Sequence, residues 1–246
     1  MLQVIVLAIL PPFILLYWVY QQDKLQREPT KNLVKAFFFG CLSVFASLLI
    51  SIPSMKIGLF PQKIASYWDA FRTAFFGAAI PEETAKLVLL WLFLRKCKDF
   101  DERMDGIVYA VCVGMGFASF ENIEYLFAAG TDWVTVGLGR SITAIPGHFG
   151  FAVIMGYYFS LYYFDNYRAP GAGLKMWLYP VLLHGLYDWI AMSQEVSPEL
   201  GGAIGLAILL MCFWLLRTSR KHIKTHLIAD SKRPAMHIDE QKSSQI

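Results

Sequence analysis

The sequence predicts an all-α membrane protein whose chain crosses the bilayer about seven times. Two features of its composition indicate this class. Of the 246 residues, 56% are apolar and only 17% are charged, whereas soluble domains contain about 45–50% apolar and about 25% charged residues. The apolar residues also gather in long runs, and about 20 such residues are enough for a helix to span a membrane.

Seven runs of this kind follow one another along the chain. They cover residues 2–20, 33–53, 74–94, 106–127, 141–164, 174–192 and 201–216. The first run has neither a basic segment before it nor a cleavage site of small residues, so we expect it to be retained as a span. Residues 54–73 are mixed in character and predict a loop or an interfacial helix. We expect one transmembrane domain over residues 1–216, followed by a loose, polar, cytoplasmic tail over residues 217–246.

The basic residues predict the orientation of the spans. Those in the first, third and fifth connections are Lys24, Arg27, Lys31, Lys35, Arg95, Lys96, Lys98, Arg103, Arg168 and Lys175. The tail adds four more next to the last span, and the opposite side has Lys56, Lys63, Arg72 and Arg140. Because basic residues favour the cytoplasmic side, the N-terminus is predicted outside and the C-terminus in the cytoplasm.

The remaining composition excludes several other classes. The net charge of +3 is too small to indicate nucleic-acid binding. The four cysteines have no metal-like or disulfide-like spacing. The chain also lacks three protease signatures: the HExxH of zinc proteases, the GxSG of rhomboids and the GxGD of presenilin-type proteases.

Ionisable residues inside the spans are the strongest indication of function, because each costs roughly 2.5–3.5 kcal/mol at the membrane centre on the milder scale. The third to sixth predicted spans contain Glu82, Glu83, Lys86, Glu121, Asn122, His148, His184 and Asp188. With spans that alternate in direction, these groups fall roughly 7–14 Å below the outer surface. Four helices therefore place polar groups at one depth, which predicts a single buried site.

Several of these residues also have a purely structural interpretation. Lys86 is three and four residues from the two glutamates and could form an ion pair with either. Asp188 could only orient His184, and Asn122 could only link two helices. In the tail, His222 and His226 share the spacing of a helix face, which we expect to be solvated. Proline residues before the site residues favour an irregular backbone that lines a cavity.

Two carboxylates and two imidazoles can activate water and stabilise an oxyanion. Consecutive residues point about 100° apart on a helix, so Glu82 and Glu83 cannot serve the same atom equally. We expect one to face the cavity as a general base and the other to hold Lys86 or a neighbouring helix. Which of the two is the base stays open at this point.

These motifs, in this order on four successive spans, resemble the PrsW family of intramembrane proteases. The resemblance rests on Glu82-Glu83-Thr84-Ala85-Lys86, on Phe117 to Asn122, on His148, and on His184 to Asp188, and it covers residues 74–192. PrsW is similar to the CAAX-protease and bacteriocin-processing superfamily. That wider superfamily tends to have Arg and Asn where this chain has Lys86 and Asp188, which favours PrsW over prenyl-protein processing.

The resemblance implies an intramembrane endopeptidase of a bacterial cytoplasmic membrane, with catalytic residues Glu82, Glu83, His148 and His184. It implies a membrane-protein substrate, in PrsW typically an anti-sigma factor at its first cleavage. We expect a glutamate-activated water, an oxyanion bound by the two histidines, and no metal. Zinc is the alternative, held by Glu82 or Glu83 with His148 and His184, a catalytic His₂Glu set. From another functional class, a proton-coupled transporter or channel would use the same groups as a relay.

Overall fold

The computed structural model describes residues 1–165 and 169–232, and within these ranges the chain is helical with no β-strand. The α-helices are α1 (Leu2–Gln22), α2 (Thr30–Lys56), α3 (Tyr67–Arg72), α4 (Ile80–Leu94), α5 (Arg103–Ala128), α6 (Trp133–Ile142), α7 (Ala144–Phe164), α8 (Ala172–Met192) and α9 (Gly201–Ser231). A π-helix, Thr73–Ala79, leads directly into α4. The prediction of an all-α chain is confirmed.

Each predicted span coincides with a long helix. Five helical segments are long and apolar enough to cross a membrane, namely Leu2–Gln22, Thr30–Lys56, Arg103–Ala128, Gly130–Phe164 and Pro198–Ser231. The other two predicted spans lie on the π-helix with α4 and on α8. Both carry ionisable residues that lower their apolar character, and both contribute to the site described below. The predicted interfacial segment contains α3, whose N-cap Ser66 Oγ accepts from the backbone N–H of Asp69 at 3.1 Å.

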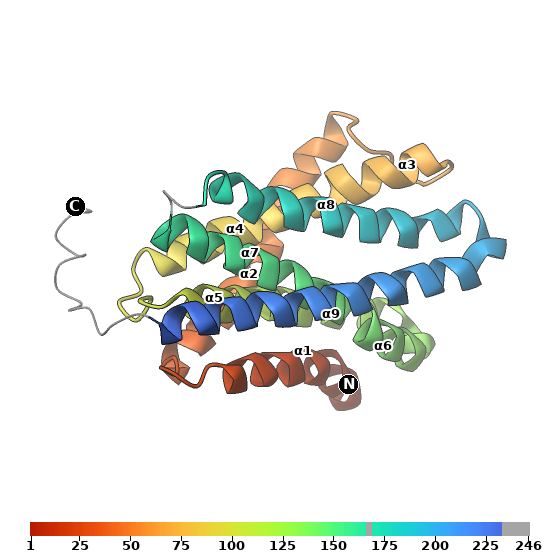
Figure 1. The fold of residues 1–246 in the computed structure, drawn as a ribbon. Helices are drawn as coiled ribbons and strands as arrows, with labels where there is room; N and C mark the ends of the chain where they lie inside the picture. The colour runs from red at the N-terminus through yellow and green to blue at the C-terminus, as the bar shows by residue number, and fades with distance from the viewer. Residues whose placement is uncertain (166–168, 233–246) are drawn as a thin grey trace.

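The long helices run side by side, and Figure 1 shows that α1 and α9 begin at the same end of the bundle, while α9 finishes at the opposite end. This arrangement agrees with an odd number of crossings between the first and the last helix. Which end faces the cytoplasm stays a prediction.

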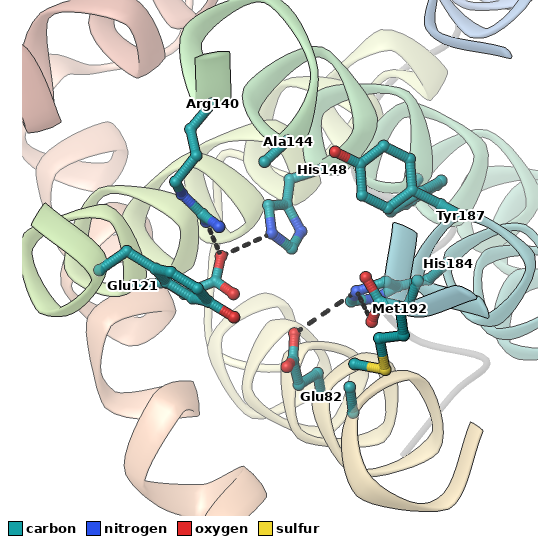
Figure 2. A pocket seen from close by; sticks show the side chains of 12 residues that line it. Glu82, Glu121, Arg140, Ala144, His148, His184, Tyr187 and Met192 are labelled. Atoms are coloured by element: carbon teal, nitrogen blue, oxygen red, sulfur yellow. Dashed lines mark hydrogen bonds and ion pairs between the residues drawn. The ribbon is translucent and has the colours of Figure 1, made fainter. Parts of the chain in front are cut away.

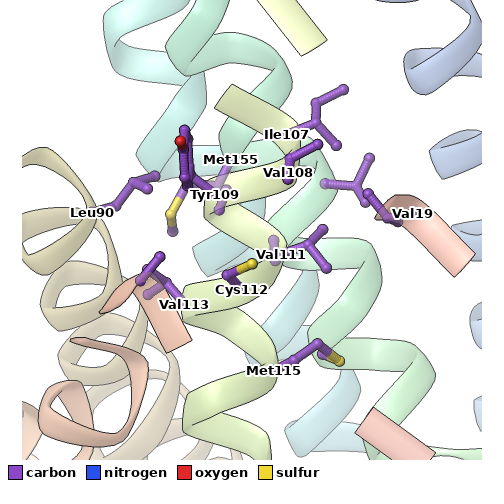
Figure 3. Packing of buried hydrophobic residues seen from close by; sticks show 14 of the residues in the cluster. Val19, Leu90, Ile107, Val108, Tyr109, Val111, Cys112, Val113, Met115 and Met155 are labelled. Atoms are coloured by element: carbon purple, nitrogen blue, oxygen red, sulfur yellow. The ribbon is translucent and has the colours of Figure 1, made fainter. Parts of the chain in front are cut away.

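α5 forms the centre of the bundle, and its residues 104–119 are all buried. Side chains from α4 and α7 pack against α5, as Figure 3 shows for Leu90 and Met155 near Tyr109 of α5. α1, α2 and α9 surround this centre and expose much of their apolar surface. In a bilayer that surface contacts lipid.

Small residues let α2 approach α5 closely. A Cβ at Gly40 would overlap the backbone carbonyl of Val113, and one at Gly116 would overlap the carbonyl of Phe37. Without a strong hydrophobic drive between helices in lipid, such close van der Waals contact is a main source of helix association. The two glycines therefore fix where α2 and α5 cross.

The expectation of a loose segment beyond residue 217 is wrong for residues 218–231, because α9 continues as a helix to Ser231. The polar end of α9 packs on the bundle through its buried face. His226 is buried, and its ring stacks on Tyr157 at 4.4 Å between centroids, so the solvated face expected there is also wrong. Asp230 accepts from the backbone N–H of Met104 at 2.9 Å at the start of α5. Residues 233–246 of the predicted tail lie outside the described residues, and so does Arg168 of the fifth connection.

Candidate active site

The paired glutamates lie in the first turn of α4, directly after the π-helix. Pro81 precedes them at the junction where the π-helix passes into α4, and it has no backbone N–H to offer to the preceding turn. Glu83 is buried, whereas the Glu82 side chain keeps 15% of its surface exposed. Lys86, one turn later, has its Nζ 2.7 Å from Glu83 Oε1 and 3.4 Å from Glu82 Oε2. The predicted ion pair thus forms with both glutamates, and more closely with Glu83.

His184 on α8 contacts both glutamates of the pair. Its Nδ1 lies 2.8 Å from Glu83 Oε1. Its Nε2 lies 3.3 Å from Asp188 Oδ2, one turn further along α8, and 3.9 Å from Glu82 Oε2. The ring of Phe151 stacks on the imidazole at 5.0 Å between centroids. Carboxylates therefore face both nitrogens of this imidazole.

His148 on α7 lies between the carboxylate of Glu121 and the ammonium of Lys86. Its Nε2 lies 2.8 Å from Glu121 Oε2 on α5, and its Nδ1 lies 3.4 Å from Lys86 Nζ. The ammonium of Lys86 also lies over the ring of Phe117, 3.8 Å from its centroid. Both nitrogens of His148 are thus engaged by groups of the site.

The two histidines differ in the protons that their partners require. Only a doubly protonated imidazole donates from both nitrogens, and His184 faces a carboxylate at each. An ammonium has no acceptor, so His148 Nδ1 accepts from Lys86 while Nε2–H donates to Glu121. These assignments follow from the hydrogen-bond network. The site thus contains one imidazole, His184, that donates from both nitrogens, and another, His148, that is fixed in the tautomer with its hydrogen on Nε2.

Arg140 is a site residue that the sequence reasoning missed. It was counted among the basic residues of an outer connection, but α6 directs its side chain into the site (Figure 2). Its Nη2 lies 2.7 Å from Glu121 Oε2, and its Nε lies 2.6 Å from Asn122 Oδ1. Asn122 also donates from Nδ2 to the carbonyl of Ala8 on α1 at 3.2 Å, so it links two helices and contacts Arg140 of the site as well. A single arginine within the otherwise uncharged segment 133–142 was the signal that could have identified it.

These side chains surround a cavity of about 70 Å³, which is large enough to hold water. Its polar lining consists of Glu82, Glu121, Tyr125, Arg140, His148, His184, Tyr187 and Asp188. Figure 2 shows Glu82 and His184 on one side of the cavity and Glu121 with His148 on the other. Glu83 and Lys86 do not line it. All eight residues predicted from the sequence thus belong to one connected polar network, and six side chains of that network, Arg140 included, line the cavity.

The same residues include a set with the chemistry of a metal site. Glu82, Glu83, His148 and His184 each offer one ligand atom, and these atoms lie within 4.8 Å of one another. Zinc ligands lie about 2.0–2.2 Å from the ion, so the atoms around one ion are roughly 3–4.5 Å apart. However, the ammonium of Lys86 already contacts Glu83 at 2.7 Å and His148 at 3.4 Å. The residues do not fit a divalent ion while Lys86 holds this position, because the two cations would repel each other.

Comparison with known proteins agrees with this site. The model of the "PrsW family intramembrane metalloprotease" matches residues 28–216. A relative from Clostridioides difficile, named "Protease PrsW", is 35% identical over 78% of this chain and 81% of its own. Another from Geobacillus kaustophilus, with the same name, is 33% identical over 88% of this chain and 91% of its own. Among solved structures, none is a significant match.

The matched region contains every residue of the network described above, and the relatives are covered over most of their length. The chain therefore belongs to the PrsW family of intramembrane proteases.

Proposed function

We propose that this protein is an endopeptidase of a bacterial cytoplasmic membrane, and that it hydrolyses a peptide bond of a membrane protein with a water activated by Glu82. The observation that carries the proposal is the division of labour between the two glutamates. Glu82 lines the cavity beside His184, whereas Glu83 is buried beneath it and engaged by Lys86 and His184. Of the two paired glutamates, only Glu82 is therefore in a position to accept a proton from a water in the cavity.

The chemistry requires a base, an oxyanion donor and a proton for the leaving group. Glu82 takes a proton from water as the water oxygen attacks the peptide carbonyl carbon, so that the carbonyl oxygen becomes an oxyanion. His184, with a hydrogen on the Nε2 that faces the cavity, donates to this oxygen. Glu82 then returns the proton to the amide nitrogen as the C–N bond breaks, which yields a carboxylic acid and an amine.

The geometry favours His184 over His148 as the oxyanion donor. His148 gives its Nε2–H to Glu121 at 2.8 Å, and its Nδ1 accepts from Lys86 and carries no hydrogen. The Nε2–H of His184 meets its carboxylate, Asp188, at a longer 3.3 Å and lies beside the cavity-lining Glu82, so it is the hydrogen that can turn to the substrate. We assign His148 the task of linking Lys86, which lies outside the cavity, to Glu121, which lines it. Asp188, at 3.3 Å from His184 Nε2, orients the donor.

We propose that no metal takes part, in contrast to the wording of the family description. Lys86 supplies the positive charge that balances the buried Glu83, and its ammonium lies among the would-be ligand atoms. Zinc content of the purified protein, measured by mass spectrometry, tests this proposal. Stoichiometric zinc, with activity lost to a chelator and restored by zinc, would overturn it.

We propose a single-span membrane protein as the substrate, and an anti-sigma factor as its class. The resemblance to PrsW supports this class, and a site buried among helices supports a substrate that reaches it from within the bilayer. No nucleic-acid partner is expected.

The decisive experiment is a cleavage assay with purified protein in detergent or vesicles and a single-span substrate. Glu82→Gln should lose cleavage and remain folded, because it removes the base and no tight ion pair. Glu83→Gln should lose cleavage and also stability. If Glu82→Gln cleaves as the unchanged protein does, the proposed mechanism is wrong. If the unchanged protein cleaves no substrate but moves protons across vesicles, the transporter alternative gains.

A further inference from the structure

Arg140 makes three contacts, and all of them are with one turn of α5. Its Nη2 donates to Glu121 and its Nε donates to Asn122, at 2.7 and 2.6 Å. Its Cζ lies 3.9 Å from the ring centroid of Tyr125. The guanidinium is therefore fixed in both position and plane, which is more than charge balance alone would require.

The oxygen that Arg140 contacts is the one that orients His148. Glu121 Oε2 accepts from Arg140 Nη2 at 2.7 Å and from His148 Nε2 at 2.8 Å. A carboxylate that accepts from one imidazole nitrogen decides which nitrogen of the ring carries the proton and how the ring is turned. Without the guanidinium, Glu121 would lose its fixed rotamer and would be attracted towards the ammonium of Lys86.

We infer that Arg140 is a positioning residue of the active site, which acts through Glu121 to hold His148 in its tautomer and orientation. The inference rests on the proposed function, in which His148 in turn accepts a hydrogen bond from Lys86 and so helps to place the Lys86–Glu83 pair. It assigns to α6, a short helix outside the four motif-bearing spans, an indirect part in catalysis.

An arginine is needed here because lysine cannot reproduce the contacts. The planar guanidinium donates to Glu121 and Asn122 from two different nitrogens and lies over the Tyr125 ring, whereas an ammonium is a point charge on a flexible chain. Arg140→Lys therefore keeps the charge but loses the geometry. A role in charge balance alone would be rescued by lysine.

The test measures kcat and KM for Arg140→Gln, Arg140→Lys, Glu121→Gln and the double variant Glu121→Gln/Arg140→Gln. Partners that orient metal-binding histidines are worth about 10–100-fold, and we take this factor as the scale for His148. We expect kcat to fall by about this factor in Arg140→Gln, with KM nearly unchanged and only partial rescue by lysine. Because Arg140 acts through Glu121, the double variant should be no slower than Glu121→Gln alone. Multiplied losses, or full rescue by lysine, would overturn the inference.

Arg95→Gln is the matched control. Arg95 also lies over an aromatic ring, that of Trp91 at 4.7 Å, but at the far end of α4 and on the surface. It should leave kcat unchanged. If Arg95→Gln and Arg140→Gln both cleave normally while Glu82→Gln does not, the inference on Arg140 fails and the proposed function stands.

A second readout needs no activity. In spectra of protein labelled with ¹⁵N-histidine, His148 should show a protected Nε2–H, identified by its loss in His148→Gln. Arg95→Gln should keep this signal and Arg140→Gln should lose it. An unchanged signal in a folded Arg140→Gln or Arg140→Lys variant contradicts the inference, whether or not a cleavable substrate has been found.

Discussion

The ammonium of Lys86 lies 2.7 Å from Glu83 Oε1, and both side chains are buried. This ion pair lies directly beneath the cavity and joins the glutamate motif to both histidines through contacts with His148 and His184. The Glu83–Lys86 ion pair therefore supports the side chains that line the cavity.

Replacing Lys86 by methionine should lower both stability and cleavage. Removal of one partner from a buried ion pair costs about 3–5 kcal/mol, because the other charge is left uncompensated. Thermal unfolding and the cleavage rate of Lys86→Met measure the two effects. The double variant Glu83→Gln/Lys86→Met should regain much of the stability without regaining activity. Equal stability of Lys86→Met and the unchanged protein would contradict a buried ionic pair.

Replacing Asp188 by asparagine should slow cleavage by about 10–100-fold, the factor found for carboxylates that orient metal-binding histidines. Asp188 Oδ2 lies 3.3 Å from His184 Nε2 and orients this nitrogen towards the cavity. The amide can still contact the ring but no longer favours its charged form. His184→Ala should be slower still, and the ratio of the two kcat values measures the share that depends on orientation. An Asp188→Asn variant as inactive as His184→Ala would indicate a direct role for the carboxylate.

Asp23, which lies outside the membrane-spanning segments, predicts that the stability of the protein depends on pH. It follows α1 and is fully buried, and burial raises the pKa of its carboxyl from 3.8 to about 6. The folded state thus binds this proton more tightly than the unfolded state does. Its contribution to stability is present below about pH 3.8 and is lost as the pH rises through about 6.

Asp23→Asn should therefore remove part of the decline in thermal stability between these two pH values, because asparagine carries no charge at either. Melting curves of both proteins over this range measure the difference. If the difference in melting temperature between the two proteins does not change with pH, the raised pKa is wrong.

The orientation can be tested with tags at the two ends of the chain. We expect a tag at the N-terminus to be reachable from outside intact cells and one at the C-terminus only after the membrane is opened. Protease protection or membrane-impermeant labelling measures this. Both tags on the same side would contradict the seven-span arrangement and the common depth of the site residues.

The sequence by itself determined the class of fold and most of the site. Long apolar runs predict helices because hydrocarbon leaves backbone groups no partner except within the helix. The cost of an ionisable group in lipid marked Glu82, Glu83, Lys86, His148 and His184 as functional. Both causes act locally along the chain, so both can be recognised without knowing how the helices pack.

The tertiary structure decided what depends on helix rotation and contact. It placed Glu82 at the cavity and Glu83 against Lys86, a choice that the spacing along α4 left open. It directed Arg140 inward from α6 to Glu121, and it packed the polar end of α9 against α7 through His226. Contacts such as Gly40 against α5 set how each helix is placed against its neighbours. Since that placement depends on residues distant in sequence, no local pattern could predict which polar side chains would meet.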